Sequence, residues 1–338
     1  MKALVYEGAW QMPVKDVPIP EINEDEVLIA VESVGICGSD VHGYRGTTGR
    51  RKPPIIMGHE FSGKIAKVGA KIDRYKEGDR VIAQPLQTCG YCDNCKAGFP
   101  NICSNRNILG VNINGAYADY VKVTENMLYH LPDEMDFNQG SLVEPLAVAM
   151  RAVNLTDFQL SETVAILGVG TIGLLTILAA RMKGAGKIIV SDMNEHRLLM
   201  AKKLGADIIV NGKEKNLVEV VRSETDGKGV AAVIEAVGIT ATANQSLFVV
   251  RNGGSVTWIG NSDPEVTINM QQIVTRELTL KGTYGFNKEF EYAIDAIKSG
   301  RVDPTLLVEA NASLTDGPKI IDDLASGKSD LIKVILKP

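Results

Sequence analysis

Leu167-Gly168-Val169-Gly170-Thr171-Ile172-Gly173 is the stretch that decides the fold of this 338-residue chain. The apolar run 163–167 comes before it and predicts a strand, whereas 171–183 predicts a helix. Three glycines between a strand and a helix allow a tight turn, a close approach of the backbone to a ligand, and close contact of the helix with the strand. The motif is weak alone, but here it has the flanking strand and helix that it needs.

The residues after this turn continue the alternation of strands and helices. Near-continuous apolar strands between amphipathic helices are typical of a parallel sheet that is covered on both faces. Six such strands predict a doubly wound α/β domain. The predicted strands are 163–167, 187–191, 207–210, 229–235, 254–259 and 277–281, and the predicted helices are 171–183, 194–204, 214–225 and 240–250.

The chain on either side of this domain has a different character. Up to about residue 129, short β-runs separated by Gly and Pro predict a β-rich lobe with long loops. Residues 1–7 predict an edge strand and not a signal peptide. Beyond residue 282 the alternation stops, and we expect this tail to return to the first lobe. The predicted domains are therefore 1–145 with 283–338, and 146–282. The segments outside the alternation are the strands 27–34, 61–68, 79–83, 116–123 and 331–336, and the helices 141–153, 288–299 and 316–325.

An acidic residue at the end of the second predicted strand, Asp192, extends the glycine motif. The pattern predicts NAD, with its diphosphate at the helix N-terminus and Asp192 accepting the ribose hydroxyls. Its charge would repel the 2′-phosphate of NADP. The alternative is that Asp192 only caps the helix that begins near Asn194. The candidate cofactor-binding residues are Gly168, Gly170, Thr171, Ile172, Gly173, Asp192, Arg197, Val237, Gly238, Ile259 and Gly260.

Four of the five cysteines lie within one short loop, with the spacing C-x2-C-x2-C-x7-C. Four thiolates complete a tetrahedron around Zn²⁺ and leave no free position, so this site is structural. A disulfide cluster is disfavoured because the N-terminus predicts no secretory leader. An iron–sulfur cluster is disfavoured because the spacing matches neither common ferredoxin pattern. The candidate ligands are Cys89, Cys92, Cys95 and Cys103.

The fifth cysteine, Cys37, lies far upstream, in Gly35-Ile-Cys-Gly-Ser-Asp-Val-His42, and Gly58-His59-Glu60 follows it. A thiol, two imidazoles and two carboxylates in glycine-bounded turns can form an open metal site with three protein ligands. The plain alternative is that Cys37 is a small buried apolar residue.

The bulk composition excludes several classes of protein. An apolar content of 45% and a charged content of 23% are typical of globular domains, and 338 residues predict two of them. A net charge of −5 argues against a nucleic-acid partner. No apolar run approaches the about 20 residues that a membrane span needs. Free thiols that bind metal favour a reducing, cytoplasmic compartment.

Together these motifs resemble those of the zinc-containing medium-chain alcohol dehydrogenases, and within that family the polyol branch of sorbitol and galactitol-1-phosphate dehydrogenases. The likeness spans the whole chain and includes Val143-Glu144-Pro145. It implies a GroES-like catalytic domain, a Rossmann domain and a site between them. It further implies NAD, one catalytic and one structural zinc per chain, and a homodimer or homotetramer.

The resemblance implies that Cys37 and His59 bind the catalytic zinc. Alcohol dehydrogenases often use a further cysteine as the third ligand, and this chain has none left. In this chain Glu144 occupies the matching family position and is the ligand that the resemblance favours, while Glu60, beside His59, is the alternative. Asp40 resembles the carboxylate that orients the histidine ligand.

The resemblance also implies how protons and substrate are handled. The Ser39 hydroxyl is expected to take the substrate proton and pass it to His42, although His42 can equally be a plain surface residue. Between Cys37 and His59 lies a cationic segment, and its arginines suit a phosphate group, the alternative being a solvated basic loop. The candidate substrate residues are Tyr44, Arg45, Arg50 and Arg51.

The expected reaction is the transfer of hydride from a secondary hydroxyl to NAD⁺, giving a ketose. The substrate is a sugar alcohol or its phosphate, of the sorbitol or galactitol 1-phosphate type. One alternative is an L-threonine or other secondary-alcohol dehydrogenase of the same family. The other is a nucleotide-binding scaffold without catalysis, which would hold one zinc and not two.

Overall fold

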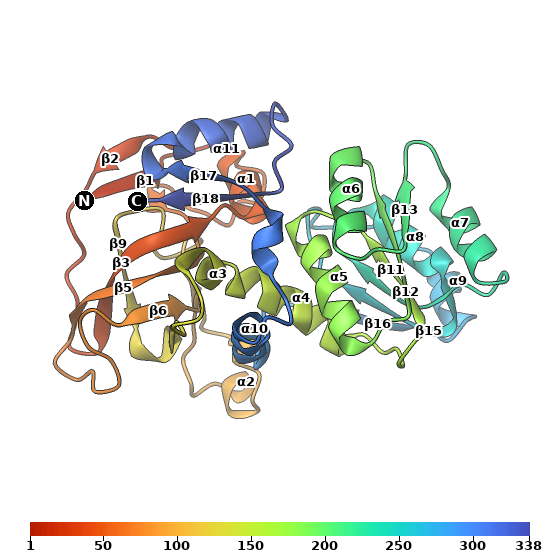
Figure 1. The fold of residues 1–338 in the computed structure, drawn as a ribbon, viewed down its shortest axis with the longest axis horizontal. Helices are drawn as coiled ribbons and strands as arrows, with labels where there is room; N and C mark the ends of the chain where they lie inside the picture. Colours follow the sequence, from red (N-terminus) through yellow and green to blue (C-terminus); the bar gives the residue numbers. More distant parts are fainter. The chain divides into compact units, whose positions relative to one another are not determined.

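The computed structural model describes residues 1–338, which divide into two compact units. The first unit is Met1–Glu144 with Phe290–Pro338, and the second is Pro145–Glu289 (Figure 1). The return to the first unit begins at Phe290, later than the expected residue 283. Glu289 accepts hydrogen bonds from Arg151 and Asn154, at 3.3 and 3.0 Å, and so belongs to the second unit. The Phe290 ring instead packs on Tyr129 of the first unit.

The second unit contains a six-stranded parallel sheet in the order β13-β12-β11-β14-β15-β16. The order reverses between β11 and β14, which confirms the predicted doubly wound fold. The central strands are buried along their length because helices cover both faces. The strands are β11 (Thr163–Leu167), β12 (Lys187–Asp192), β13 (Ile208–Asn211), β14 (Val230–Glu235), β15 (Val250–Trp258) and β16 (Thr279–Gly282).

The helices of the second unit form two groups. Helix α5 contacts α6, whereas α8 contacts α7 and α9 (Figure 1). Helix α9 is a short turn that the sequence pattern does not predict. The helices are α5 (Thr171–Lys183), α6 (Glu195–Lys203), α7 (Leu217–Glu224), α8 (Thr240–Val249) and α9 (Met270–Val274), and α4 (Val143–Leu155) leads into the unit.

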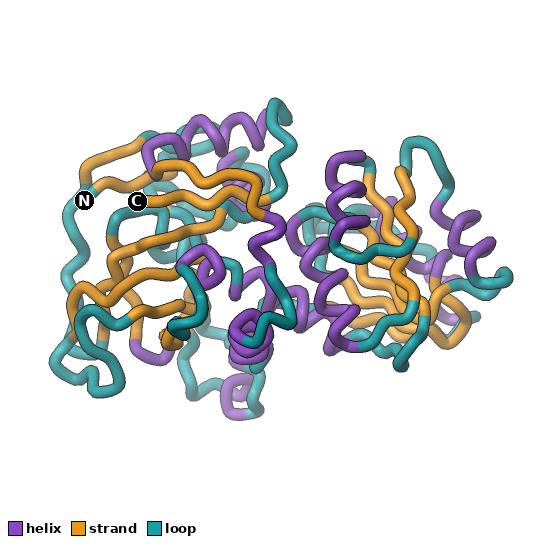
Figure 2. The backbone as a smooth tube through the Cα atoms, viewed as in Figure 1, coloured by secondary structure: helices purple, strands orange, loops and turns teal.

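The first unit is rich in strands, as predicted (Figure 2). Its largest sheet has the order β10-β6-β5-β3-β18-β17, with β9 also paired to β3. A small sheet has the order β2-β1-β4, and β7 pairs with β8. The strands are β1 (Lys2–Tyr6), β2 (Val14–Asp16), β3 (Glu26–Gly35), β4 (Ile55–Ile56), β5 (Glu60–Val68), β6 (Arg80–Ala83), β7 (Leu86–Gln87), β8 (Asn107–Ile108), β9 (Tyr120–Thr124) and β10 (Leu128–His130).

The tail of the chain completes this sheet. Strand β18 (Lys333–Lys337) pairs antiparallel with β3 and parallel with β17 (Val308–Ser313). Strand β17 lies in a segment for which no strand is expected. The helices of the first unit are α1 (Gly38–Tyr44), α2 (Asp93–Lys96), α3 (Phe137–Ser141), α10 (Glu289–Lys298) and α11 (Gly317–Ser326).

The N-terminal strand is not an edge strand, which corrects the prediction. It lies between β2 and β4, and Ala3 and Leu4 are fully buried in the core of the first unit. Apolar side chains on both of its faces find partners only in such a central position.

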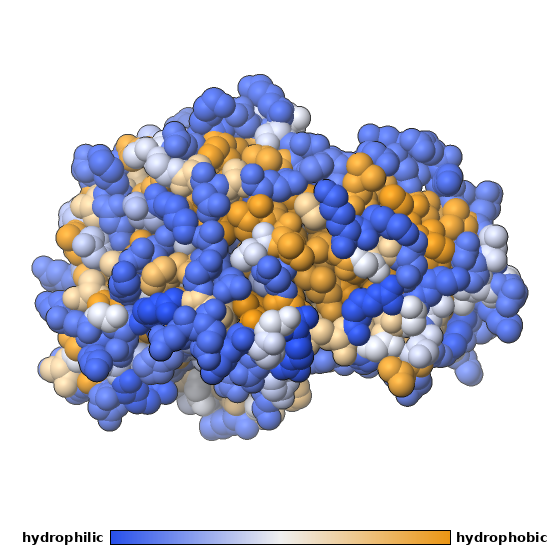
Figure 3. All heavy atoms as spheres, in the orientation of Figure 1, coloured by the Kyte–Doolittle hydropathy of each residue, from blue (hydrophilic) through white to orange (hydrophobic).

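Hydrophilic side chains cover most of the face of the first unit that Figure 3 shows, with apolar ones scattered among them. The longest helices, α4 and α5, have 13 residues each. A membrane-spanning helix needs about 20 apolar residues, so no helix of this chain meets that requirement.

Candidate active site

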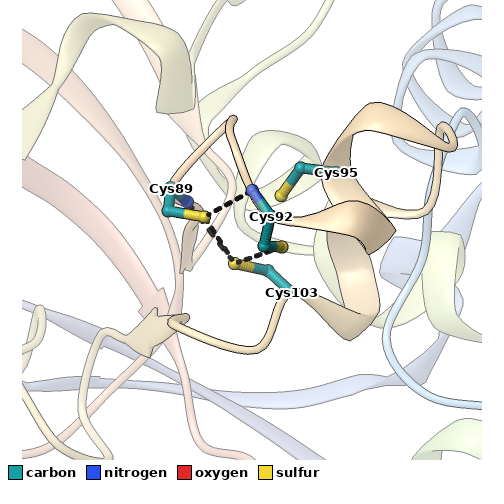
Figure 4. Close-up of side chains that lie close together, drawn as sticks. All are labelled: Cys89, Cys92, Cys95 and Cys103. Carbon is teal, nitrogen blue, oxygen red and sulfur yellow. Dashed lines mark hydrogen bonds between the residues drawn. The ribbon is translucent and has the colours of Figure 1, made fainter.

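The four clustered cysteines converge in one loop of the first unit (Figure 4). Their sulfur atoms all lie within 4.8 Å of one another. The Cys103 sulfur lies 3.5 Å from that of Cys89 and 3.8 Å from that of Cys92. Positive φ angles at Gly90 and Gly98, +74° and +83°, let the backbone fold back around the group.

These distances fit a tetrahedral zinc site. Zn–S bonds of about 2.3 Å place the sulfur atoms of a tetrahedron about 3.8 Å apart. A disulfide needs sulfur atoms about 2.05 Å apart, so the observed spacing excludes that alternative and all five cysteines are free. The loop therefore has the donor atoms and the geometry to hold a structural zinc.

A second group of possible ligands consists of Cys37, His59 and Glu60, whose ligand atoms also lie within 4.8 Å of one another. The sheet register brings them together. Gly35, the last residue of β3, pairs with Glu60, the first residue of β5. The residues just outside this pair, Cys37 and His59, therefore meet beyond the ends of the two strands.

Two glycines make room for this arrangement. Gly58 has φ +89°, and a Cβ there would lie 2.5 Å from the Tyr117 ring. A Cβ on Gly35 would lie 2.5 Å from Oε2 of Glu60. Both distances are too short for real contacts, so a larger residue at either position would displace the side chains that line the group.

Asp40 is fully buried behind His59. Its Oδ1 lies 3.5 Å from His59 Nδ1 and accepts a 2.6 Å hydrogen bond from Arg51. Its Oδ2 accepts a 2.7 Å hydrogen bond from the Tyr117 hydroxyl. Burial opposes the charge, but His59 and Arg51 hold the pKa of Asp40 well below its usual value. The carboxylate is thus fixed in place and ionised.

The donor set fits a metal. His59 is 8% exposed, and its Nδ1 lies 3.5 Å from Asp40 Oδ1, so the other ring nitrogen, Nε2, is the one available to a metal. Burial disfavours a charged imidazole, yet the charges of Asp40 and Cys37 raise the pKa of His59 well above its ordinary value. A thiol, an imidazole and a carboxylate facing one another are ligands that zinc prefers, and a divalent cation would satisfy all three.

The two candidate third ligands differ in their partners. Glu60 accepts a 2.6 Å hydrogen bond from Lys333, and both side chains are buried, with exposures of 1% and 0%. Lys333 also donates to the Ile36 carbonyl at 3.0 Å. Glu144, in the first turn of α4, lies outside the group of three and has no hydrogen bond or ion pair. Burial raises its pKa to about 7, with His59 acting in the opposite direction.

Ser39 and His42 both lie on α1 and are exposed. They are three residues apart and therefore neighbours on one side of the helix. The Ser39 hydroxyl lies 3.4 Å from the Arg51 guanidinium. Partial burial and the charge of Arg45 lower the pKa of His42. His42 is thus exposed, as expected if it is only a surface residue. Its position beside Ser39 also suits a proton acceptor.

The structure corrects most of the predicted substrate contacts. The Tyr44 hydroxyl donates to Asp322 and to the Trp10 carbonyl, both at 3.1 Å. Arg45 donates from Nε to the Ala325 carbonyl at 2.8 Å. These groups are used within the fold and are not available to a substrate.

Arg51 is likewise committed, because it is 7% exposed and holds Asp40. Arg50, of the four candidates, is exposed and has no ion pair. The sequence pattern does not reveal this difference, since three cations follow one another and only the fold decides which one points inward.

The glycine turn of the second unit matches its predicted roles. A Cβ on Gly168, which has φ +85°, would lie 2.3 Å from Val237, and one on Gly173 would lie 1.9 Å from the Gly168 carbonyl oxygen. At Gly170, which precedes α5, a Cβ meets only an Arg197 nitrogen at 4.0 Å. The first and third glycines are thus needed for packing, and the second leaves space beside the helix N-terminus. Thr171 and Ile172 open that helix.

Asp192 ends β12, and Asn194, not Asp192, caps α6, because its side chain accepts from the Arg197 amide. The Asp192 carboxylate accepts backbone N–H groups of Val169 at 2.8 Å and of Met193 at 2.7 Å. The buried Arg197 Nε has no hydrogen bond. An acid and an unsatisfied cation beside the open glycine turn fit a dinucleotide.

The loops after β14 and β15 touch each other through glycines. A Cβ on Gly238 or Gly260 would lie 2.2 Å from the other loop's backbone. Glu235, which is not among the predicted cofactor-binding residues, accepts the amides of Val237 and Gly238 at 2.9 and 2.8 Å. Ile259 donates its amide to the Glu235 carbonyl. This buried carboxylate therefore fixes the two loops that carry the predicted cofactor residues Val237, Gly238, Ile259 and Gly260.

Comparison with known proteins identifies the family of the chain. The alcohol dehydrogenase GroES-like domain matches residues 23–133, and the zinc-binding dehydrogenase model matches residues 171–299. Sorbitol dehydrogenase of Bacillus subtilis (strain 168) is 36% identical and aligns with 100% of this chain and 97% of its own. L-threonine 3-dehydrogenase of Bacillus velezensis is 37% identical, and the alignment covers 100% of this chain and 99% of the relative. The structure of a zinc-binding dehydrogenase from Sinorhizobium meliloti 1021, bound to NADP, has a TM-score of 0.93 and is 32% identical. The superposition covers 100% of this chain and 99% of that one.

A cysteine–histidine–carboxylate group in a GroES-like unit and a glycine turn in a Rossmann unit define a zinc-binding dehydrogenase. More narrowly, the chain belongs to the zinc-containing medium-chain alcohol dehydrogenases, in their polyol branch.

Proposed function

We propose that the protein is a zinc- and NAD-dependent polyol dehydrogenase that oxidises a secondary hydroxyl of a sugar alcohol to a ketone. The observation that carries this proposal is the convergence of Cys37, His59 and a carboxylate at the ends of β3 and β5. The similarity to a sorbitol dehydrogenase supports the choice of a polyol.

Two zinc ions are proposed per chain. The four clustered cysteines would hold the structural ion. Cys37, His59 and Glu144 would hold the catalytic ion, which acts as a Lewis acid that lowers the pKa of a substrate hydroxyl. Glu144 is preferred to Glu60 because Lys333 already neutralises Glu60, whereas Glu144 has no partner of opposite charge.

Residues around the ligands keep them in position. The ionised Asp40 faces Nδ1 of His59, so it fixes the ring orientation and leaves Nε2 for a metal. Arg51 and Tyr117 each hold one oxygen of Asp40 and prevent it from rotating. Ser39 offers a hydroxyl that can accept the substrate proton, and His42 on the same side of α1 can pass it to solvent.

The second unit would bind the cofactor. Gly170 and the start of α5 accept the diphosphate, and Asp192 the adenosine ribose. NAD supplies the hydride acceptor. Since Asp192 is an anion, NAD is preferred to NADP in this proposal.

A substrate panel tests the proposal. Sorbitol, galactitol 1-phosphate and L-threonine are each mixed with NAD⁺ or NADP⁺ and the zinc-loaded protein, and the reduced nicotinamide is followed by absorbance. We expect oxidation of a polyol with NAD⁺ and its loss in Cys37→Ser. Turnover of L-threonine alone would replace the polyol with the second candidate, which the similar threonine dehydrogenase favours.

Metal analysis separates an enzyme from a scaffold, since we expect two zinc ions per chain and a scaffold would hold one. We further propose that two copies pair along β16, which is an edge strand with exposed Thr279 and Gly282. A monomeric mass in solution would contradict this pairing.

A further inference from the structure

The first unit contains a cavity of about 560 Å³ that none of the metal-ligand candidates lines. It lies beside the cationic segment that follows α1, and Arg50 and Lys52 form part of its wall. Small-molecule sites commonly have volumes of about 300–1,000 Å³. The cavity is therefore of the right size for one metabolite.

The charge of this cavity is positive. Neither Arg50 nor Lys52 has an ion pair. The only acidic residue in the wall is Glu26, and it is already neutralised by Lys122 at 2.9 Å. Two cations without partners face one space, an arrangement that favours an anion.

The neutral polar groups of the wall also favour an anion. The amide oxygen of Asn114 accepts the Ile56 amide at 3.1 Å, and that of Gln87 accepts from Asn107 at 2.9 Å. The NH₂ groups of these two side chains remain able to donate, whereas the NH₂ group of Asn112, also in the wall, already donates to Asn107 at 3.0 Å. Cations and NH₂ donors thus line part of the cavity, while Leu109, Ile113 and Met127 form an apolar part that suits a carbon skeleton.

We propose that this cavity binds a small phosphate-bearing metabolite, and that this ligand is an effector and not the substrate. Phosphate matches the donors because the planar guanidinium of arginine binds two of its oxygens at once and an amide NH₂ group can donate to another. The binding step does not depend on the proposed function.

The effect of the ligand follows from Arg51, which stands between the two cations in the chain. Its guanidinium donates to Asp40 at 2.6 Å, to the Ser39 carbonyl at 3.0 Å and to the Gly110 carbonyl at 2.9 Å. A phosphate bound by Arg50 and Lys52 would restrain the segment that positions Asp40 behind His59. Occupancy of the cavity therefore changes the rate of the reaction.

Calorimetric titration of the zinc-loaded full chain tests the site, with inorganic phosphate and glycerol 3-phosphate as probes. We expect one binding event per chain in the wild type and at least about tenfold weaker binding in Arg50→Gln/Lys52→Gln. The matched control is Lys67→Gln/Lys76→Gln, which removes the same charge from exposed positions of the same unit. Circular dichroism verifies that both variants are folded.

Three results would overturn the proposal. The first is absence of binding by the wild type, and the second is equal weakening in the control, which would mean general charge attraction. The third is competition between glycerol 3-phosphate and a polyol, or loss of binding in Cys37→Ser, which would place the anion at the catalytic site. Phosphate binding by a protein that oxidises no alcohol would refute the proposed function and leave this site intact.

Discussion

Replacing Lys333 with methionine removes the cation from a buried ion pair while it keeps most of the side-chain volume. Glu60 is 1% exposed, and Lys333 is the only side chain that donates to its carboxylate. Breaking a buried pair by removing one partner typically costs about 3–5 kcal/mol, because a buried charge loses its compensation. We expect the free energy of unfolding of the first unit to fall by that amount.

The double replacement Lys333→Met/Glu60→Leu supplies the contrast. Apolar residues of similar volume often replace a buried ion pair at no cost, or stabilise by about 1–4 kcal/mol. The double variant should therefore be more stable than the single one. A simple loss of packing at position 333 predicts the opposite order, because the double variant would then add a second defect.

Guanidinium unfolding followed by the fluorescence of Trp10 measures the effect. The chain has 2 tryptophans, so a Trp258→Phe background confines the signal to the first unit. A Cys37→Ser background prevents a metal from taking up the freed carboxylate. A loss below about 1 kcal/mol in the single variant, or a double variant no more stable than the single one, would refute this account of the pair.

Three further predictions concern the metal, the cofactor and pH. Glu144→Gln should lower the zinc content from two ions per chain to one while Glu60→Gln keeps two, and the reverse result in metal analysis would make Glu60 the ligand. Asp192→Asn should raise the ratio of kcat/KM for NADP⁺ to that for NAD⁺ at least about tenfold, and a wild type that already prefers NADP⁺ would contradict the assignment. Burial opposes ionisation of Glu289, but hydrogen bonds from Asn154 and its own loop and the charge of Arg151 lower its pKa in the folded state. Its contribution is present above the unfolded pKa of about 4.3 and is lost as the pH falls through the folded pKa, so Glu289→Gln should be less stable than wild type at pH 7 and the difference should shrink on acidification; a constant difference would argue otherwise.

The Rossmann unit is well predicted from the sequence because its signals are local. Strand β11 and helix α5 have the predicted bounds, since a run of apolar residues ends at a glycine turn and a helix starts there. Strand β17 is missed because it is only partly buried and carries polar residues. Helix α1 is missed because Gly38 and Gly43 are residues that disfavour helices and favour loops.

The candidate site is predictable as far as spacing and residue type reach. The cysteine loop follows from its spacing, and Cys37 with His59 from their motifs. The role of Lys333 cannot be predicted from the sequence, because a lysine in a short apolar strand does not indicate that its partner, Glu60, lies 273 residues earlier. The orientation of Arg51 is equally hidden, since its role depends on Asp40 being fully buried within hydrogen-bond distance of it.

Strand β18 has a consequence for the order in which the protein is made. It fills the place between β3 and β17, yet the ribosome produces it only after the whole second unit. The second unit is continuous and can fold as it emerges, whereas β3 must wait with an open edge. The Rossmann unit of the nascent protein therefore folds first, and the ion pair between Glu60 and Lys333 forms only near the end of translation. A stalled or truncated product would contain a folded second unit but would expose the strand edge that β18 covers in the complete protein.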